Sequence, residues 1–490
     1  MIQGSWLGRA RLCVLAAFTY AFFFSGGGPN QATRMALTES LVVRHQPDIT
    51  PYHARTIDKG FRKDQFFADK APGISLLATV PYELMRIGDR IGGIPSESRA
   101  AQQAKLGILT FLFAGLAGLA CALLLRRLAL FLGCGRPAAE LAAFAYAFGT
   151  IAFPFSTLLF GHQLSALCIL SAFVITLEHR KLGTLTQPRV LVALGAIWTL
   201  SLVVEYPTAL LVAVFGTATL VWTFDRGRPV KSVVRTLLWA GAGGAPLLVV
   251  HAAFLVWSYG KFALPYIYVS EPYFRAHMSG GILGIGTPTM LATYGSLLSP
   301  YRGLLFYCPV LVLAVAGLGS WIDSAKDRAT LPIVLAALGI YLLFGCSYYA
   351  WDGGGSVGPR HLLPILPLLM LLVAFFADRA RWTFGVTLVF AAVSSAIMLA
   401  VTTVHIQLPM GDAYHANPFY DVVVRSILDG KGAINAQDAF VPYPRADGAF
   451  NLGMIVGFGP LAALVIVPAV WVAAYLPSLV SQLRKPAHAQ

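Results

Sequence analysis

The stretch AKLGILTFLFAGLAGLACALLL, residues 104–125, has one charged side chain in 22 residues. About 20 apolar residues in a helix cross the hydrocarbon core of a bilayer, so this stretch predicts a membrane-spanning helix. The rest of the chain repeats the pattern. We predict about twelve such helices, with approximate spans 11–28, 104–125, 138–157, 162–178, 189–204, 206–223, 236–257, 303–322, 330–349, 361–377, 382–402 and 452–476.

Composition leads to the same conclusion. The 490 residues are 57% hydrophobic and only 12% charged, with a mean hydropathy of +0.69. One soluble core cannot hide that much apolar surface, so lipid must cover most of it. The sequence predicts an all-α polytopic protein forming a single integral membrane domain, 1–490. Glu205-Tyr206-Pro207 divides two of the spans, and one kinked helix over 189–223 is the alternative there.

Basic residues indicate the orientation. Short loops on one side of the twelve-span arrangement carry the clusters Arg9/Arg11, Arg126/Arg127/Arg136, Arg180/Lys181, Arg226/Arg228/Lys231/Arg235, Lys326/Arg328, Arg379/Arg381 and Arg484/Lys485. The positive-inside rule makes that side cytoplasmic, together with both termini. The long loops 29–103, 258–302 and 403–451 then face outward, and 73–92 predicts an amphipathic helix along the membrane surface. A secretory signal is the alternative for the first span, but no small-x-small cleavage site follows it.

The net charge of +14 does not indicate nucleic-acid binding. About half of the Lys and Arg residues lie on the predicted outer side, as do about sixteen of the 22 carboxylates. A surface of mixed charge suits phosphorylated substrates handled beside acids and bases. The six cysteines are scattered in or near apolar spans, which argues against disulfides and thiolate metal sites.

The first long loop holds the densest group of candidate functional residues. Two Asp-Lys pairs, Asp58-Lys59 and Asp69-Lys70, lie eleven residues apart, and Arg34 falls on a predicted helix. A carboxylate can act as a base or metal ligand, and a lysine can bind phosphate. We predict Asp69 and Asp58 as catalytic residues, and Lys70 and Lys59 as phosphate-binding residues. The alternative is a solvated loop in which these charges pair with one another.

Further ionisable residues stand at the predicted outer ends of helices. They are His162, Glu205, Arg302, Arg360 and His361. Charges near a membrane are costly and usually face a protein interior or a wet cavity, so we predict that they converge. Arg302 and Arg360 would bind phosphate. The alternatives are that His162 packs a helix start, Arg302 reaches lipid headgroups and Glu205 satisfies backbone donors freed by Pro207.

Taken in order, these motifs resemble bacterial membrane glycosyltransferases of the GT-C superfamily. The resemblance is carried by Asn30 and Arg34, Asp69-Lys70-Ala71-Pro72-Gly73, Gly161-His162, Glu205-Tyr206-Pro207, Ser299-Pro300-Tyr301-Arg302-Gly303-Leu304 and Gly358-Pro359-Arg360-His361-Leu362-Leu363-Pro364. The resemblance covers most of the chain. These enzymes are relatives of the protein O-mannosyltransferases and of the aminoarabinose transferases that act on lipid A.

The resemblance implies transfer of a hexosyl or pentosyl group from a polyprenyl-phosphate-linked donor lipid to a cell-envelope acceptor at the outer face of a bacterial inner membrane. Asn30, Arg34, His162, Glu205 and His361 would bind substrate. Many superfamily members carry Asp-Glu soon after the first span, where this chain has Asn30-Gln31. Asp58 and Asp69 are therefore the leading candidates for the base, followed by Glu39 and Asp48.

In such a reaction a carboxylate takes the acceptor's proton and cations neutralise the departing phosphate. In-line displacement would invert the anomeric carbon. No ligand spacing requires a metal, although Mg²⁺ or Mn²⁺ bridging phosphate and carboxylate is an alternative. The loop 403–451, with Tyr414, His415, Tyr420 and Tyr443, is a candidate acceptor-side lid or a plain polar loop.

Two other classes of function fit twelve spans. One is a transporter or flippase for lipid-linked or anionic solutes, and the other is a non-catalytic envelope-assembly protein. A transporter is expected to place charges near mid-membrane in broken helices and to have similar halves. Here the charges lie at outer helix ends and the first loop has no counterpart later in the chain, which favours the enzyme.

Overall fold

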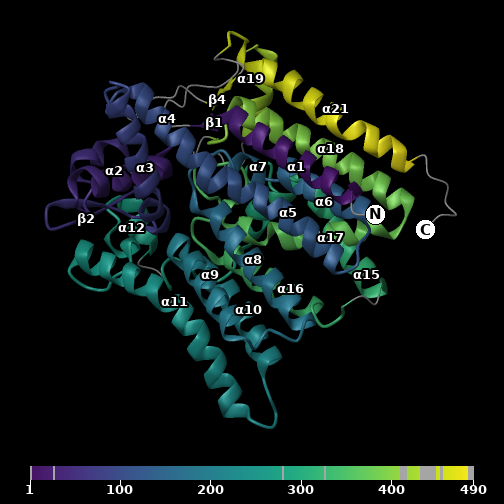
Figure 1. The fold of residues 1–490 in the computed structure, drawn as a ribbon. Coiled ribbons are helices and arrows are strands. Elements are labelled where there is room, and N and C mark those ends of the chain that lie inside the picture. Colours follow the sequence, from purple (N-terminus) through teal and green to yellow (C-terminus); the bar gives the residue numbers. More distant parts are fainter. Residues whose placement is uncertain are drawn as a thin grey trace.

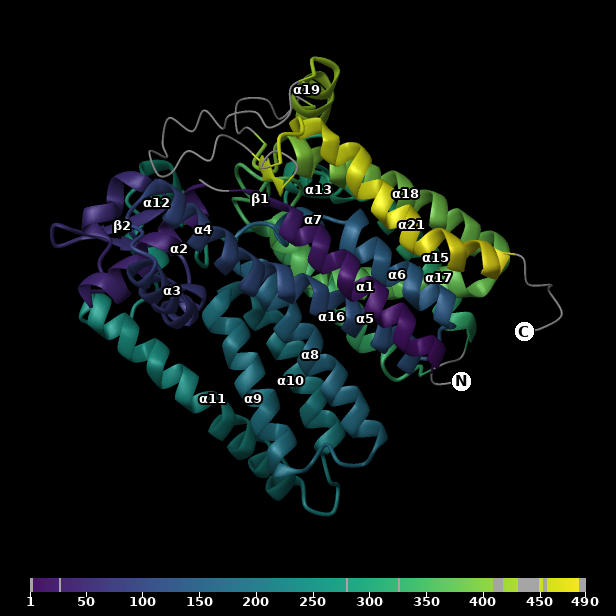
Figure 2. The same cartoon turned by 45° about the horizontal axis from the view of Figure 1, so that its top comes forward.

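The computed structural model describes residues 3–25, 28–278, 281–324, 327–408, 417–430, 449–452 and 456–483. Helices dominate, as predicted, and Figures 1 and 2 show most of them packed side by side in one body. The chain is an all-α, multi-pass membrane protein. Part of the candidate lid, including Tyr414, His415 and Tyr443, lies outside the described residues, as do Lys326, Arg484 and Lys485.

The longer helices correspond to the predicted spans. They are α1 (Gln3–Phe22), α4 (Arg99–Thr110), α5 (Leu116–Phe131), α6 (Arg136–Gly149), α8 (Gly161–Lys181), α9 (Pro188–Val204), α10 (Ala209–Thr223), α11 (Pro229–Tyr259), α15 (Leu313–Ser324), α16 (Leu331–Ser347), α17 (Leu366–Arg379), α18 (Arg381–Val404) and α21 (Ala463–Leu483). A π-helical turn, Phe111–Gly115, joins α4 to α5 in one continuous apolar helix.

Shorter elements connect these helices. They are α2 (Pro29–Glu39), α3 (Gly73–Ile91), α7 (Ala152–Phe155), α12 (Pro272–Met278), α13 (Met290–Leu297), α14 (Leu304–Tyr307), α19 (Arg425–Leu428), and the strands β1 (Phe23–Ser25), β2 (Lys59–Arg62), β3 (Gln65–Ala68) and β4 (Ala449–Asn451). The antiparallel pairs are β1 with β4 and β2 with β3.

Six helices of the described residues are long and apolar enough to cross a bilayer, and five shorter apolar helices accompany them. The number twelve therefore stays a prediction. The chain does break at Glu205, whose backbone is extended, and a 3₁₀ turn then leads into α10. Residues 189–223 thus form two helices and not one kinked helix.

Small residues let some of these helices approach closely. Gly195 on α9 faces the backbone of Ala240 on α11, and Gly243 on α11 faces the backbone of Val192, so a methyl group at either glycine would collide with the other helix. Association of helices in lipid depends on such close packing, because apolar side chains gain little by leaving apolar lipid.

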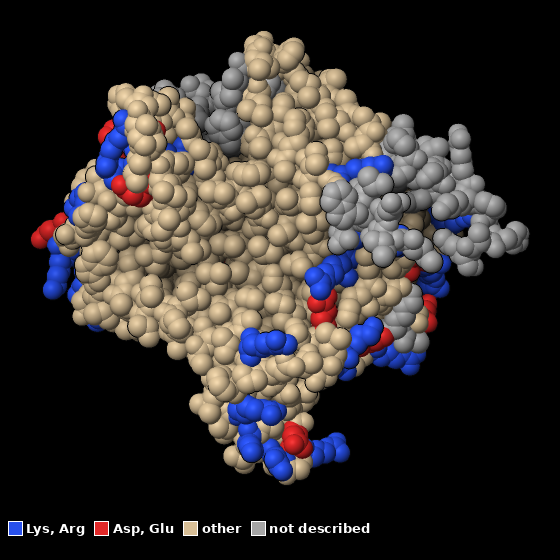
Figure 3. Space-filling model, viewed as in Figure 1, with Lys and Arg blue, Asp and Glu red and all other residues tan. Residues whose placement is uncertain are grey.

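Charge marks the two ends of the body. In Figure 3 charged side chains gather over the first-loop elements on one side. On the other side they gather over the turn between α10 and α11 and over the helix ends near the N-terminus. A broad belt without them lies between, as expected for a lipid-covered surface. The first loop is therefore at the opposite end from several of the basic clusters.

The amphipathic helix predicted over 73–92 is present as α3. Ile74, Ala78 and Tyr82 are buried, whereas Leu77, Val80, Leu84, Ile87 and Ile91 form an exposed apolar stripe, with Ile91 84% exposed. The residue spacing follows the helical repeat. An apolar stripe left uncovered by protein is the surface that a helix lying in the membrane interface presents to lipid.

Candidate active site

A β-hairpin brings the two Asp-Lys pairs together. Lys63 and Asp64, which join β2 to β3, both have positive φ, as in the tight turns that match the twist of a hairpin. The register then pairs Lys59 with Ala68. Asp58 directly precedes β2 and Asp69 directly follows β3, so the hairpin places two residues eleven apart in sequence at the same open end.

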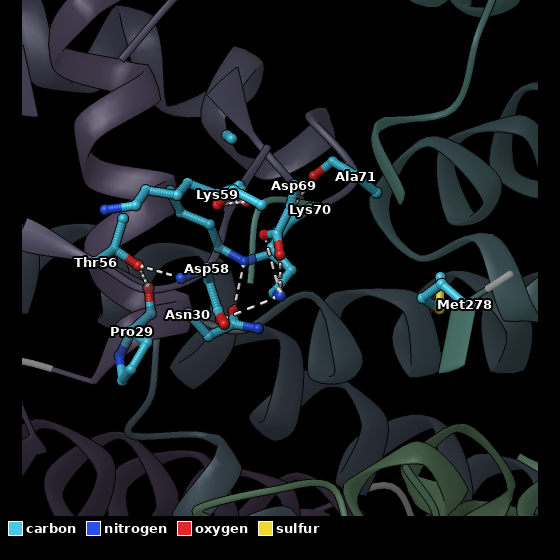
Figure 4. A network of polar contacts seen from close by, with 12 residues as sticks. Pro29, Asn30, Thr56, Asp58, Lys59, Asp69, Lys70, Ala71 and Met278 are labelled. Carbon is cyan, nitrogen blue, oxygen red and sulfur yellow. Dashed lines mark hydrogen bonds and ion pairs between the residues drawn. The ribbon is translucent and has the colours of Figure 1, made fainter. Parts of the chain in front are cut away.

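Lys70 lies between the two carboxylates (Figure 4). Its Nζ is 3.1 Å from Oδ2 of Asp58 and 3.1 Å from Oδ1 of Asp69. The side chains are 13% exposed for Asp58, 4% for Asp69 and 18% for Lys70. Asp58 is held further by its backbone N–H, which donates to Thr56 Oγ1 (3.0 Å), while that hydroxyl donates to the Pro29 carbonyl (2.8 Å).

This arrangement shifts both ionisation equilibria. Burial raises the pKa of Asp69 to about 6; the Lys70 ammonium opposes the shift, whereas the Asp58 carboxylate adds to it. Burial alone would lower the pKa of Lys70, but the two carboxylates outweigh it and the net direction is upward. Lys70 therefore stays charged, and Asp69 can exchange a proton near neutral pH, as a general base should.

The three side chains line a cavity of about 270 Å³. It receives residues from four separated parts of the chain, namely Asp58, Asp69 and Lys70 from the first loop, Tyr266, Val269, Tyr273, Phe274 and Met278, then Tyr301, and finally Tyr348, Tyr349, Ala350, Asp352, Gly354, Arg360 and His361. Of the side chains predicted to converge, Asp58, Asp69, Lys70, Arg360 and His361 line this cavity, whereas His162, Glu205 and Arg302 do not.

A second ionic cluster supports this cavity without lining it. Arg34 is 2% exposed; it donates to Asn30 Oδ1 (2.9 Å), Glu205 Oε1 (3.0 Å) and the Ala71 carbonyl (3.4 Å). His162 Nδ1 is 3.7 Å from the same Glu205 oxygen, and its ring stacks edge-on against His361 at 5.6 Å. Ala71 follows Lys70, so this cluster fixes the segment that carries the cavity's charges.

Arg302 and Lys59, both predicted to bind phosphate, are not on the cavity wall. Arg302 is fully buried over the Tyr301 ring and donates to the carbonyls of Tyr301, Gly354 and Leu408. Lys59 donates to the His53 carbonyl at 2.7 Å, and Figure 4 shows its side chain extending away from Asp58 and Lys70. Successive side chains of a strand point to opposite faces, so Asp58 and Lys59 cannot face the same cavity.

The lower-ranked carboxylates are also elsewhere. Glu39 binds Arg55 at 2.6 Å and Asp48 binds Arg44 at 3.2 Å. Neither lines the cavity. Both carboxylates pair with a neighbouring arginine, and such pairing within the loop is what the alternative of a solvated loop predicted for its charges.

The aromatic lining of the cavity did not emerge from the sequence. Tyr266, Tyr273, Phe274, Tyr348 and Tyr349 contribute to it. The available signal was the density of aromatic residues in PYIYVSEPYF, residues 265–274, and SYYAW, residues 347–351. Aromatic residues are common throughout this chain, at 12%, so their number alone did not separate these segments from lipid-facing ones.

A divalent cation fits this site poorly. No group of three or more His, Cys, Asp or Glu side chains within the described residues is arranged to hold a metal ion. The position between Asp58 and Asp69 is taken by the Lys70 ammonium. Carboxylates that share a lysine are already partly neutralised, so we derive no step through a metal.

A scan of protein-family models and a search of curated proteins found no match for this chain. Solved structures do match. ArnT from Cupriavidus metallidurans bound to undecaprenyl phosphate has a TM-score of 0.52 and 15% identity, over 99% of this chain and 82% of that one. The apo form of the same protein gives 0.50 and 15%, over 97% and 76%.

The apo oligosaccharyltransferase of Archaeoglobus fulgidus has a TM-score of 0.48 and 12% identity, and this chain spans 60% of its length. At such identities the likeness establishes the fold. The chain has the fold of ArnT, so the fold that the resemblance implied is confirmed.

Proposed function

We propose that this protein is a membrane glycosyltransferase that uses a polyprenyl-phosphate-linked sugar as donor. The observation that carries the proposal is a buried pair of carboxylates, Asp58 and Asp69, sharing Lys70 at a cavity that also contains Arg360. Base and phosphate-binding cations thus meet at one place. The likeness to ArnT, which was solved with undecaprenyl phosphate, supports the choice of donor.

In the proposed reaction a hydroxyl oxygen of the acceptor attacks the anomeric carbon of the donor sugar. The bond from that carbon to the phosphate oxygen breaks, and its electron pair stays on the oxygen, releasing polyprenyl phosphate. Asp69 takes the hydroxyl proton, which typically accelerates such a step by about 10²–10⁴-fold. Attack opposite the leaving group inverts the anomeric centre.

Arg360 and Lys70 would receive the phosphate. Lys70 already contacts two carboxylates, whereas none of the described residues places a carboxylate within ion-pair distance of Arg360, whose guanidinium lies over the Phe160 ring. Arg360 is partly buried and its Nε has no hydrogen-bond partner among the described residues, so an anion bound there would supply the missing partner. Charge building up on the leaving phosphate strengthens this contact in the transition state.

The active site would face the outside of the bacterial inner membrane. The first loop lies at the opposite end of the body from the basic turn between α10 and α11 (Figure 3). The positive-inside rule supports a cytoplasmic position for that turn and both termini, and therefore an outer position for the hairpin and its cavity.

The direct test supplies the purified full chain, in lipid nanodiscs, with a set of undecaprenyl-phosphate hexoses and pentoses and a cell-envelope acceptor fraction. We expect sugar transfer by the wild type and its loss in Asp69→Asn and Lys70→Ala. Transfer unchanged in both variants would refute the assignment. Movement of donor lipid across the bilayer without sugar transfer would favour a flippase.

A further inference from the structure

Two groups of residues with unlike chemistry line the cavity and are called its two walls below. The ionic wall contains Asp58, Asp69, Lys70 and Arg360. The aromatic wall contains Tyr273, Phe274, Tyr348 and Tyr349. The catalytic proposal uses the first wall and leaves the second without a role.

The aromatic wall runs from the surface into the cavity. Tyr273 is 54% exposed, and its ring centre lies 4.4 Å from that of His277. His277 stacks nearly parallel on Tyr349 at 5.3 Å, and Tyr349 is 4.8 Å from Tyr348. Tyr348 in turn lies 5.1 Å from His361 beside the ionic wall. Aromatic surface is thus continuous from the mouth to the reacting groups.

The protein holds this wall in a fixed position relative to the carboxylates. The backbone N–H and the hydroxyl of Ser270 both donate to the Lys59 carbonyl, at 2.9 and 2.8 Å, next to Asp58. Arg275 on α12 donates to the Val269 carbonyl at 3.0 Å. On the other side the Tyr349 N–H donates to the Gly284 carbonyl at 3.0 Å. Figures 1 and 2 show α12 beside α2 and β2, far from them in sequence. Such a wall is preorganised for a ligand.

A sugar ring has the shape and polarity that these walls require. Aromatic faces pack against the apolar C–H face of a ring, and the ring's hydroxyls project from its edge, where Asp58 and Asp69 can accept hydrogen bonds. The cavity of about 270 Å³ is slightly smaller than typical ligand pockets of roughly 300–1,000 Å³. The donor sugar would occupy it, so the acceptor ring would lie at the mouth, against Tyr273.

The acceptor ring is expected to be uncharged. Lys70 is shared by two carboxylates and Arg360 is assigned to the donor phosphate, and a third carboxylate, Asp352, also lines the cavity. The four residues of the aromatic wall carry no charge. A phosphate or carboxylate on the acceptor would therefore meet like charges, because both cations of the cavity, Lys70 and Arg360, would already be engaged by the carboxylates and the donor phosphate.

A peptide acceptor bound as an added strand fits less well. Strand β2 pairs with β3 on one side, and Gly60 forms a bridge with Val269 on the other. Both edges of the strand nearest Asp58 are thus engaged, which leaves little backbone for strand addition.

We propose that the acceptor is a neutral sugar ring of an envelope glycan, held against Tyr273 at the exposed end of the aromatic wall while its hydroxyl reaches Asp69. This inference depends on the proposed glycosyl transfer and names the acceptor class for the same site.

The test is saturation-transfer NMR on the full chain in nanodiscs, with methyl glycosides of glucose, galactose and mannose as probes. At least one is expected to receive saturation on the protons of one ring face. Tyr273→Ala should lower that signal at least fivefold, and Tyr273→Phe should retain it because stacking does not need the hydroxyl. Tyr294→Ala is the matched control, since Tyr294 is 53% exposed on α13 and does not line the cavity.

Undecaprenyl-phosphate binding is measured in parallel on the same samples. If the lipid binds and none of the glycosides does, the acceptor inference is overturned and the donor assignment stands. The same conclusion follows if an uncharged acetyl-Ser-Thr-amide peptide, and not a glycoside, receives saturation that depends on Tyr273. If the lipid itself fails to bind, the proposed function fails. Thermal unfolding of each variant shows whether a loss of the saturation signal results from a loss of folded protein. Tyr349→Phe is a second, milder variant of the aromatic wall and is expected to keep the signal.

Discussion

Two buried ionic clusters lie next to each other in this protein, and they differ in what surrounds them. In the cavity, Lys70 lies between Asp58 and Asp69, and all three side chains line open space. Behind it, Arg34 uses its donors on Asn30, Glu205 and a backbone carbonyl, and none of these side chains lines the cavity. The same residue types therefore border open space in one cluster, where we propose that they react, and are fully occupied by protein partners in the other.

The largest effect expected from this difference is on Asp69. Replacing Asp69 with Asn removes the base and should lower the turnover number by about 10²–10⁴-fold. Asp58→Asn should cost less, because Asp69 and Lys70 remain. Asp64→Asn, in the turn of the same hairpin and exposed, is the control. Initial rates of sugar transfer measure all three. A larger loss of rate in Asp58→Asn than in Asp69→Asn would indicate that Asp58, and not Asp69, is the base.

The second cluster should respond in stability. Arg34→Ala leaves Glu205 buried with its guanidinium partner removed, which is expected to cost about 3–5 kcal/mol of unfolding free energy. Arg127→Ala breaks a pair in which Arg127 is 62% exposed, and should cost less than about 1 kcal/mol. Chemical or thermal unfolding in a defined detergent measures both. Equal losses in the two variants would show that the buried cluster is not a structural anchor.

Arg360 and Lys59 were both predicted from the sequence to bind phosphate, but they are expected to differ in their effect on donor binding. Arg360→Ala should raise the KM for the donor lipid about 10- to 100-fold, the equivalent of about 1.5–3 kcal/mol for a hydrogen bond to a charged group. Lys59→Ala should change it less than twofold, because that side chain faces away from the cavity. Donor titrations at saturating acceptor give both values. The reverse order would contradict the assignment of Arg360.

The smallest effect concerns pH. Asp69 must be ionised to act as a base, so the rate should fall about tenfold per pH unit below about 6. The contribution of Asp69 to the free energy of unfolding has the opposite pH dependence. Because the pKa of Asp69 is raised in the folded state, this stabilising contribution is full below the pKa of the unfolded state and is lost as pH rises through about 6. Asp69→Asn should therefore be inactive yet at least as stable as wild type at pH 8. Rate profiles and unfolding midpoints at pH 5 to 8 test both.

The sequence by itself determined the class of protein and much of the charged site. Apolar runs such as 104–125 must enter lipid whatever their neighbours are, because the free energy of exposing them to water is local to each run. The cost of isolated charges near the membrane predicted that His162, Glu205, Arg302, Arg360 and His361 would converge. Of these, Arg360 and His361 line one cavity with Asp58, Asp69 and Lys70, and the other three do not.

Tertiary structure alone decided which charges line the cavity. Alternation along β2 turns Lys59 away from Asp58, and backbone carbonyls from 301, 354 and 408 surround Arg302. The aromatic wall likewise depends on α12 being held against β2 by Ser270. These outcomes depend on contacts between residues tens to hundreds of positions apart, and side-chain direction at such contacts is set by packing, which residue type and spacing do not encode.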